Sequence, residues 1–113
     1  MNENHINYVE FKANDLEKTK AFYAKAFGWT FTDYGPDYVA FSASGLDGGF
    51  ERTERKIRNG ALIVLYSKNL EKSKNTVLKC KGTISKDIFS FPGGHRFHFL
   101  DPSNNELAVW SDQ

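Results

Sequence analysis

Apolar and polar positions along the chain follow two periods, and the change from one to the other occurs twice. Residues 6–13 and 61–67 carry β-branched, aromatic and other apolar side chains, the second as a nearly continuous apolar run, which is typical of strands. After each run, apolar residues recur at the spacing of an amphipathic helix. These stretches follow Asp15 and Asn69, residue types that cap helix N-termini. The pattern predicts a strand followed by a helix in each half of the chain.

A repeat underlies this symmetry. Residues 15–20 read Asp-Leu-Glu-Lys-Thr-Lys, and residues 69–74 read Asn-Leu-Glu-Lys-Ser-Lys. The two helical stretches end at Gly28 and Gly82, which are separated by the same number of residues as the two starts. We expect both glycines to adopt the left-handed conformation that terminates a helix. A repeat of this length indicates two copies of one supersecondary unit.

Three further strand-like segments follow each helix, separated by turn-forming clusters of Gly, Pro, Asn and Asp. We expect these strands at residues 29–33, 38–43 and 48–51 in the first copy and at 83–91, 95–100 and 106–110 in the second. The predicted fold class is therefore α+β, with two βαβββ modules in a single domain of residues 1–113. Module one covers about residues 5–51, a polar linker about 52–60, and module two about 61–111.

Composition narrows the classes of partner. The 113 residues include 15 Lys and Arg and 14 Asp and Glu, a net charge of +1, so we expect no nucleic-acid partner. We expect no membrane partner either, because no apolar run approaches the length of a membrane-spanning helix. The single Cys80 favours a reducing cytoplasm, and we expect it to be a buried structural residue of the second helix. Aromatic residues make up 15% of the chain and could fill a core or line a ligand cleft.

Several motifs together resemble one family. They are the Asp15-Leu16 helix start, Phe27-Gly28-Trp29, Gly48-Gly49-Phe50 and the closing turn Asp101-Pro102-Ser103-Asn104-Asn105. In this order they resemble the small single-domain members of the vicinal oxygen chelate superfamily, which includes glyoxalase I, bleomycin-resistance proteins and extradiol dioxygenases. The resemblance implies an incomplete curved barrel with helices on its convex face, a concave ligand cleft and a homodimer. Asn104 stands where the family usually has Gly, and we expect it to take the same left-handed conformation.

The resemblance also locates the positions at which metal-using members hold a divalent cation. Three of these positions are occupied here by Tyr8, Leu62 and Ala108, of which the last two have no donor atom. The fourth, near residues 48–51, cannot be aligned. Glu10 and His98 could both face the cleft, but two ligands do not hold a metal firmly. We therefore expect neither a metal nor another cofactor.

What remains is a predicted pocket lined by aromatic and polar side chains. The candidate ligand-binding residues are Tyr8, Glu10, Phe50, Tyr66, Arg96, His98 and Trp110. Glu10 could act as a general base and His98 as its acid partner. Alternatively, Glu10 pairs with Arg96 in a polar groove, and His98 is a core histidine with a satisfied hydrogen bond. We expect the aromatic residues of the first helix and its exit to be core residues: Phe22, Tyr23, Phe27 and Trp29.

Three functions are consistent with these residues. The first, which we favour, is a metal-free protein that binds a small aromatic or cationic molecule, as in the bleomycin-resistance branch. The second is a lyase or isomerase of the glyoxalase type, either metal-dependent or metal-free through Glu10 and His98. The third is a non-catalytic interaction domain whose dimer is the functional object.

Overall fold

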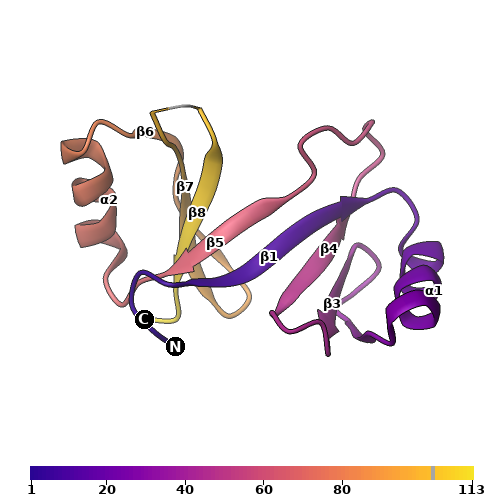
Figure 1. The fold of residues 1–113 in the computed structure, drawn as a ribbon. Helices are drawn as coiled ribbons and strands as arrows, with labels where there is room; N and C mark the ends of the chain where they lie inside the picture. The colour runs from indigo at the N-terminus through magenta and orange to yellow at the C-terminus, as the bar shows by residue number, and fades with distance from the viewer. Residues whose placement is uncertain (103) are drawn as a thin grey trace. The chain divides into compact units, whose positions relative to one another are not determined.

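The computed structural model describes residues 1–102 and 104–113, and it contains the predicted strands and helices in the predicted order (Figure 1). The elements are β1 (Ile6–Ala13), α1 (Leu16–Phe27), β2 (Thr30–Asp33), β3 (Tyr38–Ser42), β4 (Gly48–Arg52), β5 (Leu62–Tyr66), α2 (Leu70–Lys79), β6 (Thr83–Phe91), β7 (Gly94–Leu100) and β8 (Glu106–Ser111). This confirms an α+β fold built from two βαβββ modules. The chain forms two compact units: an N-terminal unit, Tyr8–Ala61, and a C-terminal unit, Leu62–Gln113 together with Met1–Asn7.

The N-terminal unit is a four-stranded sheet with α1 against one face. Its strand order is β2-β3-β4-β1, with β1 parallel to β4 and the other pairs antiparallel. Four buried residues form the core. Apolar side chains from β1, α1 and β2, and from the residue just before β2, pack around them. The core residues are Ala13, Val39, Phe41 and Phe50, and the surrounding side chains are Phe11, Leu16, Tyr23, Trp29 and Phe31. Aromatic rings therefore supply most of the apolar surface that holds α1 to this sheet.

The C-terminal unit repeats this plan with strand order β5-β8-β7-β6, and α2 packs over β6, β7 and β8 (Figure 1). Its core is Leu70, Phe97 and Val109, surrounded by Leu65, Val77, Ile84, Ile88 and Phe99. The N-terminal segment is tied to this unit, because Asn4 N donates to Tyr66 O (2.7 Å) and Tyr66 N donates to His5 O (3.1 Å). Trp110 Nε1 also donates to Asn7 Oδ1 (3.0 Å).

The helix starts confirm the capping prediction, but the second helix ends differently from the first. Asp15 Oδ1 accepts from Lys18 N (3.0 Å), and Asn69 Oδ1 accepts from Lys72 N (3.1 Å). Gly28 has the expected left-handed conformation at the end of α1, with φ of 75°. After α2 the prediction for Gly82 is wrong.

At the end of α2 it is Lys81 that adopts the left-handed conformation, with φ of 71°. Gly82 serves another purpose, since a Cβ there would lie 2.6 Å from Val77 Cγ1 and 3.3 Å from the Leu100 carbonyl oxygen. The missing side chain lets the chain pass close to α2. In the closing turn, Asn104 has a φ of 66°, which confirms its expected conformation.

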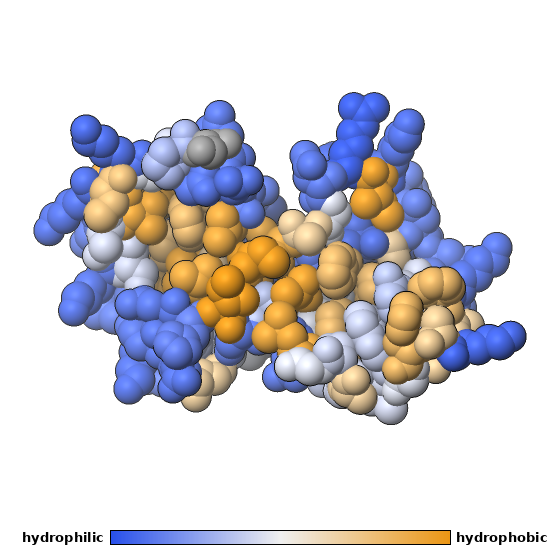
Figure 2. All heavy atoms as spheres, in the orientation of Figure 1, coloured by the Kyte–Doolittle hydropathy of each residue, from blue (hydrophilic) through white to orange (hydrophobic). Residues whose placement is uncertain are grey.

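Two expectations about burial are wrong. Phe22 and Phe27 are 58% and 63% exposed, whereas Tyr23 and Trp29 pack against the core. Only one edge of α1 contacts the sheet, and the two exposed phenylalanines pack edge-on with each other instead (6.3 Å between ring centroids). Figure 2 shows apolar side chains at the surface over α1. Cys80 is also exposed rather than buried, because it lies at the end of α2.

Candidate functional site

The helix-free face of the N-terminal unit carries a chain of hydroxyl groups that ends on a buried carboxylate. The side chains alternate along β1, so Tyr8, Glu10 and Lys12 point away from Phe11, which packs on the core. Tyr38 Oη donates to Glu10 Oε1 (3.1 Å) and lies 2.6 Å from Tyr8 Oη. Because the single hydroxyl hydrogen of Tyr38 goes to Glu10, Tyr8 must donate to Tyr38. Glu10 is only 5% exposed.

The backbone of β4 makes room for this chain of hydroxyls. Ala40 pairs with Gly49 in the β3–β4 ladder, and the ring of Tyr38 lies over Gly49. A Cβ at Gly49 would come within 2.7 Å of Tyr38 Cε1 and Cζ. Gly48 plays the same part on the core side, where a Cβ would collide with the ring of Phe41. The Gly-Gly pair is therefore explained by two aromatic rings that pack on opposite faces of one strand.

Tyr38 is held in its neutral form. Burial raises the pKa of its hydroxyl, and the nearby Glu10 carboxylate and Tyr8 hydroxyl raise it further. Tyr38 therefore remains a hydrogen-bond donor at every physiological pH. Together, Tyr8 and Tyr38 present two neutral aromatic side chains beside one carboxylate.

The family's metal positions do not fit a divalent cation in this chain. The Tyr8 hydroxyl is occupied by its bond to Tyr38, while Leu62 and Ala108 offer no donor atom. Glu51, the carboxylate nearest to the fourth position, is paired with the ammonium of Lys12. Within residues 1–102 and 104–113, no three His, Cys, Asp or Glu side chains are grouped closely enough to share a metal ion. Charge neutralisation by Lys12 and the lack of donors make these residues poor ligands.

The helix-free face of the C-terminal unit carries the other predicted polar residues. On β7, Arg96 and His98 alternate with Phe97 and Phe99, which pack under α2. Arg96 stands opposite Trp110 on β8 and opposite Phe89 on β6. Its guanidinium carbon lies 5.4 Å from the centre of the Phe89 ring and 5.6 Å from that of Phe91, the geometry of a cation–π contact.

The indole and phenol of this face are anchored by hydrogen bonds. Trp110 Nε1 donates to Asn7, and Tyr66 Oη donates to Asp112 Oδ1 (2.6 Å). The two rings pack edge to face at 5.4 Å. Tyr66 is buried and Trp110 half-buried, so Trp110 offers the larger accessible ring.

His98 is buried and is oriented by a carboxylate. Its Nδ1 lies 3.3 Å from Glu106 Oε2, which also accepts from Ser85 Oγ (3.0 Å). A carboxylate only accepts hydrogen bonds, so Nδ1 carries the hydrogen and Nε2 presents a lone pair. Burial, and to a lesser extent the charge of Arg96, lowers the pKa of His98. The imidazole is therefore neutral at pH 7, and its role as the acid partner of Glu10 stays a prediction.

The predicted site residues are divided between the two units. Tyr8, Glu10 and Phe50 belong to the N-terminal unit, and Tyr66, Arg96, His98 and Trp110 to the C-terminal unit. Phe50 lies in the core beneath α1, where its ring is 5.3 Å from that of Tyr23, and we leave it out of the proposed site. Phe50 is paired with Phe11 in the β1–β4 ladder, so it shares the helix-covered face with that residue.

Tyr38 and Glu106 are absent from the residues predicted from sequence, yet they hold Glu10 and His98 in place. Strand alternation puts Glu106 on the same face as Ala108, the residue opposite His98, so its carboxylate could have been paired with His98. Tyr38 had no such signal, because its partner Glu10 lies on a strand that is not its neighbour in the sheet.

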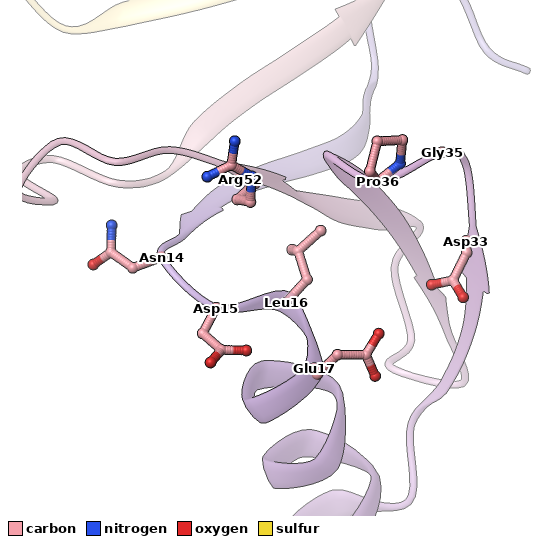
Figure 3. A pocket seen from close by; sticks show the side chains of 8 residues that line it. All are labelled: Asn14, Asp15, Leu16, Glu17, Asp33, Gly35, Pro36 and Arg52. Carbon is pink, nitrogen blue, oxygen red and sulfur yellow. The ribbon is translucent and has the colours of Figure 1, made fainter.

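A surface cavity of about 380 Å³ lies elsewhere, at the N-terminal end of α1 (Figure 3). Its lining residues include none of the predicted site residues: Asn14, Asp15, Leu16, Glu17, Asp33, Gly35, Pro36 and Arg52. The charged groups in it already have partners. Asp15 caps α1, Lys20 bridges Glu17 and Asp33, and Arg52 pairs with Asp37. This cavity is a solvated groove between satisfied charges.

No helix in the described part of the chain is long and apolar enough to cross a membrane. Among solved structures, the chain is similar to one described as an NAD-dependent benzaldehyde dehydrogenase from Legionella pneumophila (TM-score 0.74, 15% identity, covering 93% of this chain and 97% of that one). It is also similar to the Mn(II)-bound glyoxalase from Novosphingobium aromaticivorans (TM-score 0.73, 22% identity, 97% of this chain and 39% of that one). A third similar structure is a methylmalonyl-CoA epimerase (TM-score 0.76, 9% identity, 100% and 99% coverage). Identities this low show the fold alone.

No curated protein matches the chain significantly. A family model, by contrast, matches residues 5–109, nearly the whole chain. The matched residues include both helix starts and all eight strands except the last two residues of β8. The chain belongs to the Glyoxalase/Bleomycin resistance protein/Dioxygenase superfamily.

Proposed function

We propose that this chain is a metal-free protein that binds a small aromatic or cationic molecule on the helix-free face of its N-terminal unit. One observation carries the proposal: the buried carboxylate of Glu10 is flanked by two neutral tyrosines, Tyr8 and Tyr38. A carboxylate attracts a cation, and aromatic faces beside it add cation–π and stacking contacts. The Lys12–Glu51 pair is internally neutral and does not oppose a cation.

The test uses benzyltrimethylammonium, which combines a cation with an aromatic ring, in calorimetric titrations. Glu10→Gln keeps the shape of the side chain and its capacity to accept from Tyr38 but removes the charge. We expect it to weaken binding by about tenfold or more, the ratio that corresponds to about 1.4 kcal/mol. Glu54→Gln is the matched control, because the Glu54 carboxylate is 87% exposed in the same unit. Binding that is unchanged in Glu10→Gln would remove the proposal.

The metal-free part is tested separately. We expect elemental analysis of the untagged protein, and titrations with Ni(II), Zn(II), Co(II) and Mn(II), to show no stoichiometric binding, since Tyr8, Leu62 and Ala108 are poor or impossible ligands. Tight binding of any of these ions would overturn this part and would make a metal-dependent lyase the better interpretation.

A metal-free lyase or isomerase is the second candidate. It is favoured by the His98–Glu106 pair, which holds a neutral imidazole with a fixed tautomer, the arrangement of a general base. Turnover of a bound ligand that disappears in His98→Asn or Glu10→Gln would support it. Full activity in both variants would remove it.

We also propose that the protein is a homodimer in the cytoplasm. The single Cys80 favours a reducing compartment. Phe22 and Phe27, two exposed aromatic residues side by side on α1, support burial against a second copy. Light scattering of the purified protein tests the oligomeric state directly, and a monomer at all concentrations would contradict it.

A further inference from the structure

His98 carries a buried hydrogen-bond acceptor on the helix-free face of the C-terminal unit. The residue is only 5% exposed, and its Nε2, within the described residues, has no hydrogen-bond partner. Its Nδ1 faces the carboxylate of Glu106, which also accepts from Ser85 Oγ. Because a carboxylate only accepts, the ring hydrogen lies on Nδ1, and Nε2 of the neutral ring can only accept. A buried acceptor without a donor is unfavourable, so a group that donates to Nε2 is bound with a gain in free energy.

The strands next to β7 bring no donor to this nitrogen. Ala108 stands directly opposite His98 on β8, and Val64 stands opposite Ala108 on β5. Both side chains are apolar and buried. On β6, Lys86 is paired with His98, but its ammonium lies toward the Phe89 ring, 6.0 Å from the ring centre. The neighbours of the imidazole on β8 and β5 are therefore apolar, and a ligand has to supply the donor itself.

Aromatic rings flank the imidazole on both neighbouring strands. The ring centre of Phe89 on β6 lies 5.8 Å from that of His98. On β8, Trp110 is two residues from Ala108, the diagonal position that an aromatic side chain can reach. Trp110 is half-buried, and the bond from its Nε1 to Asn7 fixes the indole. A ring-shaped ligand can therefore pack on an aromatic side chain while it donates to Nε2.

The charged groups of this face are already engaged. Glu106 is bound by His98, and Asp112 accepts from Tyr66 Oη (2.6 Å). The guanidinium of Arg96 lies over two phenylalanine rings, in cation–π contact with both. These groups carry charges of both signs, and none of them requires a charged ligand. An apolar surface with one buried acceptor fits a neutral molecule best.

We propose that the helix-free face of the C-terminal unit binds a neutral aromatic molecule with a hydroxyl or N–H group on its ring. That group donates to His98 Nε2, and the ring packs against Trp110. The proposal goes beyond the function proposed above, because it concerns other residues and a ligand without charge. It involves no transfer of the proton, so it does not depend on the lyase or isomerase candidate either.

The test compares phenol with anisole in titrations followed by NMR at about pH 7.5. Both molecules have the ring and the oxygen atom, but only phenol has a donor, and it is neutral because phenolic hydroxyls have a pKa near 10. We expect phenol to bind about tenfold more tightly than anisole, the effect of one hydrogen bond to a buried acceptor. Indole and 1-methylindole form a second pair with an N–H donor and should show the same order. Nitrogen NMR of the histidine rings reads the contact directly, since phenol but not anisole should shift the Nε2 signal of His98.

Two variants assign the contact. His98→Asn keeps a donor toward Glu106 and removes the acceptor, so we expect it to lower the affinity for phenol to that for anisole and to leave the affinity for anisole unchanged. His95→Asn makes the same change at an exposed histidine of the same strand and should alter neither affinity. If His98→Asn fails to fold, the comparison of phenol with anisole and the NMR shift in the unmodified protein still test the proposal.

Three outcomes would overturn the inference. Equal affinity for phenol and anisole, or an Nε2 signal that phenol does not move, would show that water alone satisfies this nitrogen. A preference for phenol that survives in His98→Asn would place the donor on another acceptor. The two proposals fail independently, because binding of benzyltrimethylammonium without any preference for phenol would remove only the site at His98. The reverse result would remove only the cation site at Glu10.

Discussion

Adding a single methyl group at Gly49 should break the hydrogen-bonded chain from Tyr8 to Glu10. Gly49 lies directly under the ring of Tyr38, and a Cβ at this position would be 2.7 Å from two ring carbons, Cε1 and Cζ. Carbon atoms in contact are ordinarily about 3.5–4.0 Å apart, so in Gly49→Ala the ring must move by roughly 1 Å. The backbone of Gly49 cannot move instead, because it is paired with β1 on one side and β3 on the other.

The size of the loss depends on the bonds that this movement breaks. Tyr38 Oη makes one hydrogen bond to a neutral hydroxyl (2.6 Å) and one to a carboxylate (3.1 Å). Such bonds contribute about 0.5–1.5 and about 1.5–3 kcal/mol respectively. Replacing Gly by Ala in a strand returns about 0.5–1 kcal/mol of backbone entropy. We therefore expect Gly49→Ala to lower the free energy of unfolding by about 1–4 kcal/mol.

Equilibrium unfolding in urea measures this loss, and a double-mutant cycle tests its cause. Tyr38→Ala removes the ring with which the new Cβ collides. In that background Gly49→Ala should cost nothing or stabilise the protein slightly, so the two changes must be strongly non-additive. Gly35→Ala is not a suitable control, because Gly35 has a positive φ, but Ser42→Ala on the neighbouring strand is exposed and should change the free energy by less than about 0.5 kcal/mol.

Equal costs of Gly49→Ala in the presence and absence of the Tyr38 ring would contradict a collision with that ring. The cost would then come from the backbone of β4 rather than from the ring above it. A cost below about 0.5 kcal/mol in the unmodified background would show that Tyr38 can rotate away freely. Packing on Gly49 would then not hold the hydroxyl groups of Tyr8 and Tyr38 in place beside Glu10.

The other predictions concern a helix cap, a titrating side chain and an exposed ring. Asp15→Ala should lower the free energy of unfolding by about 1 kcal/mol in urea unfolding, since the bond to Lys18 N is lost, whereas Asp15→Asn should cost far less. Burial lowers the pKa of His98 in the folded protein, so the unfolded chain binds a proton at this residue more readily. The stability contributed by neutral His98 is therefore present above the pKa of the unfolded chain, near 6.5, and is lost as the pH falls below it. The stability difference between the unmodified protein and His98→Asn should therefore shift against the unmodified protein on acidification, and a pH-independent difference would contradict the assignment. Phe27→Ser should leave the unfolding free energy of the monomer nearly unchanged, because the ring is 63% exposed, yet weaken self-association in light scattering; a core-sized loss of stability would contradict its exposure.

The fold was predictable because its signals are local. Asp15 and Asn69 mark helix starts that depend only on a side chain and the next turn of backbone. Side chains alternate along a strand, and Phe11 on β1 packs against the core as such a pattern requires. The prediction for Gly82 was wrong because the position of a glycine in the sequence does not show whether a positive φ or close packing requires the missing side chain.

The candidate site was less predictable because its contacts are long-range. Glu10 is held by Tyr38, 28 residues away, and the two strands are not neighbours in the sheet. Burial of Phe22 and Phe27 was predicted from helical periodicity, which identifies an apolar stripe but not how much of it the sheet covers. On α1 the covered part is narrow, and two rings remain in solvent.

The two copies of the repeat agree on their helix-covered faces and differ on their helix-free faces. The two copies share helix starts and cores of the same kind, so the helix-covered faces follow one plan. The helix-free faces do not: Glu10 on β1 corresponds in the repeat to Val64 on β5, and the polar residues of the second copy, Arg96 and His98, come from β7 instead. Residues that maintain the fold are under the same packing constraint in both copies, whereas a buried carboxylate or a buried imidazole lowers stability unless something else requires it. Folding alone therefore does not explain the presence of the side chains that differ between the two copies. Binding of a ligand would explain it.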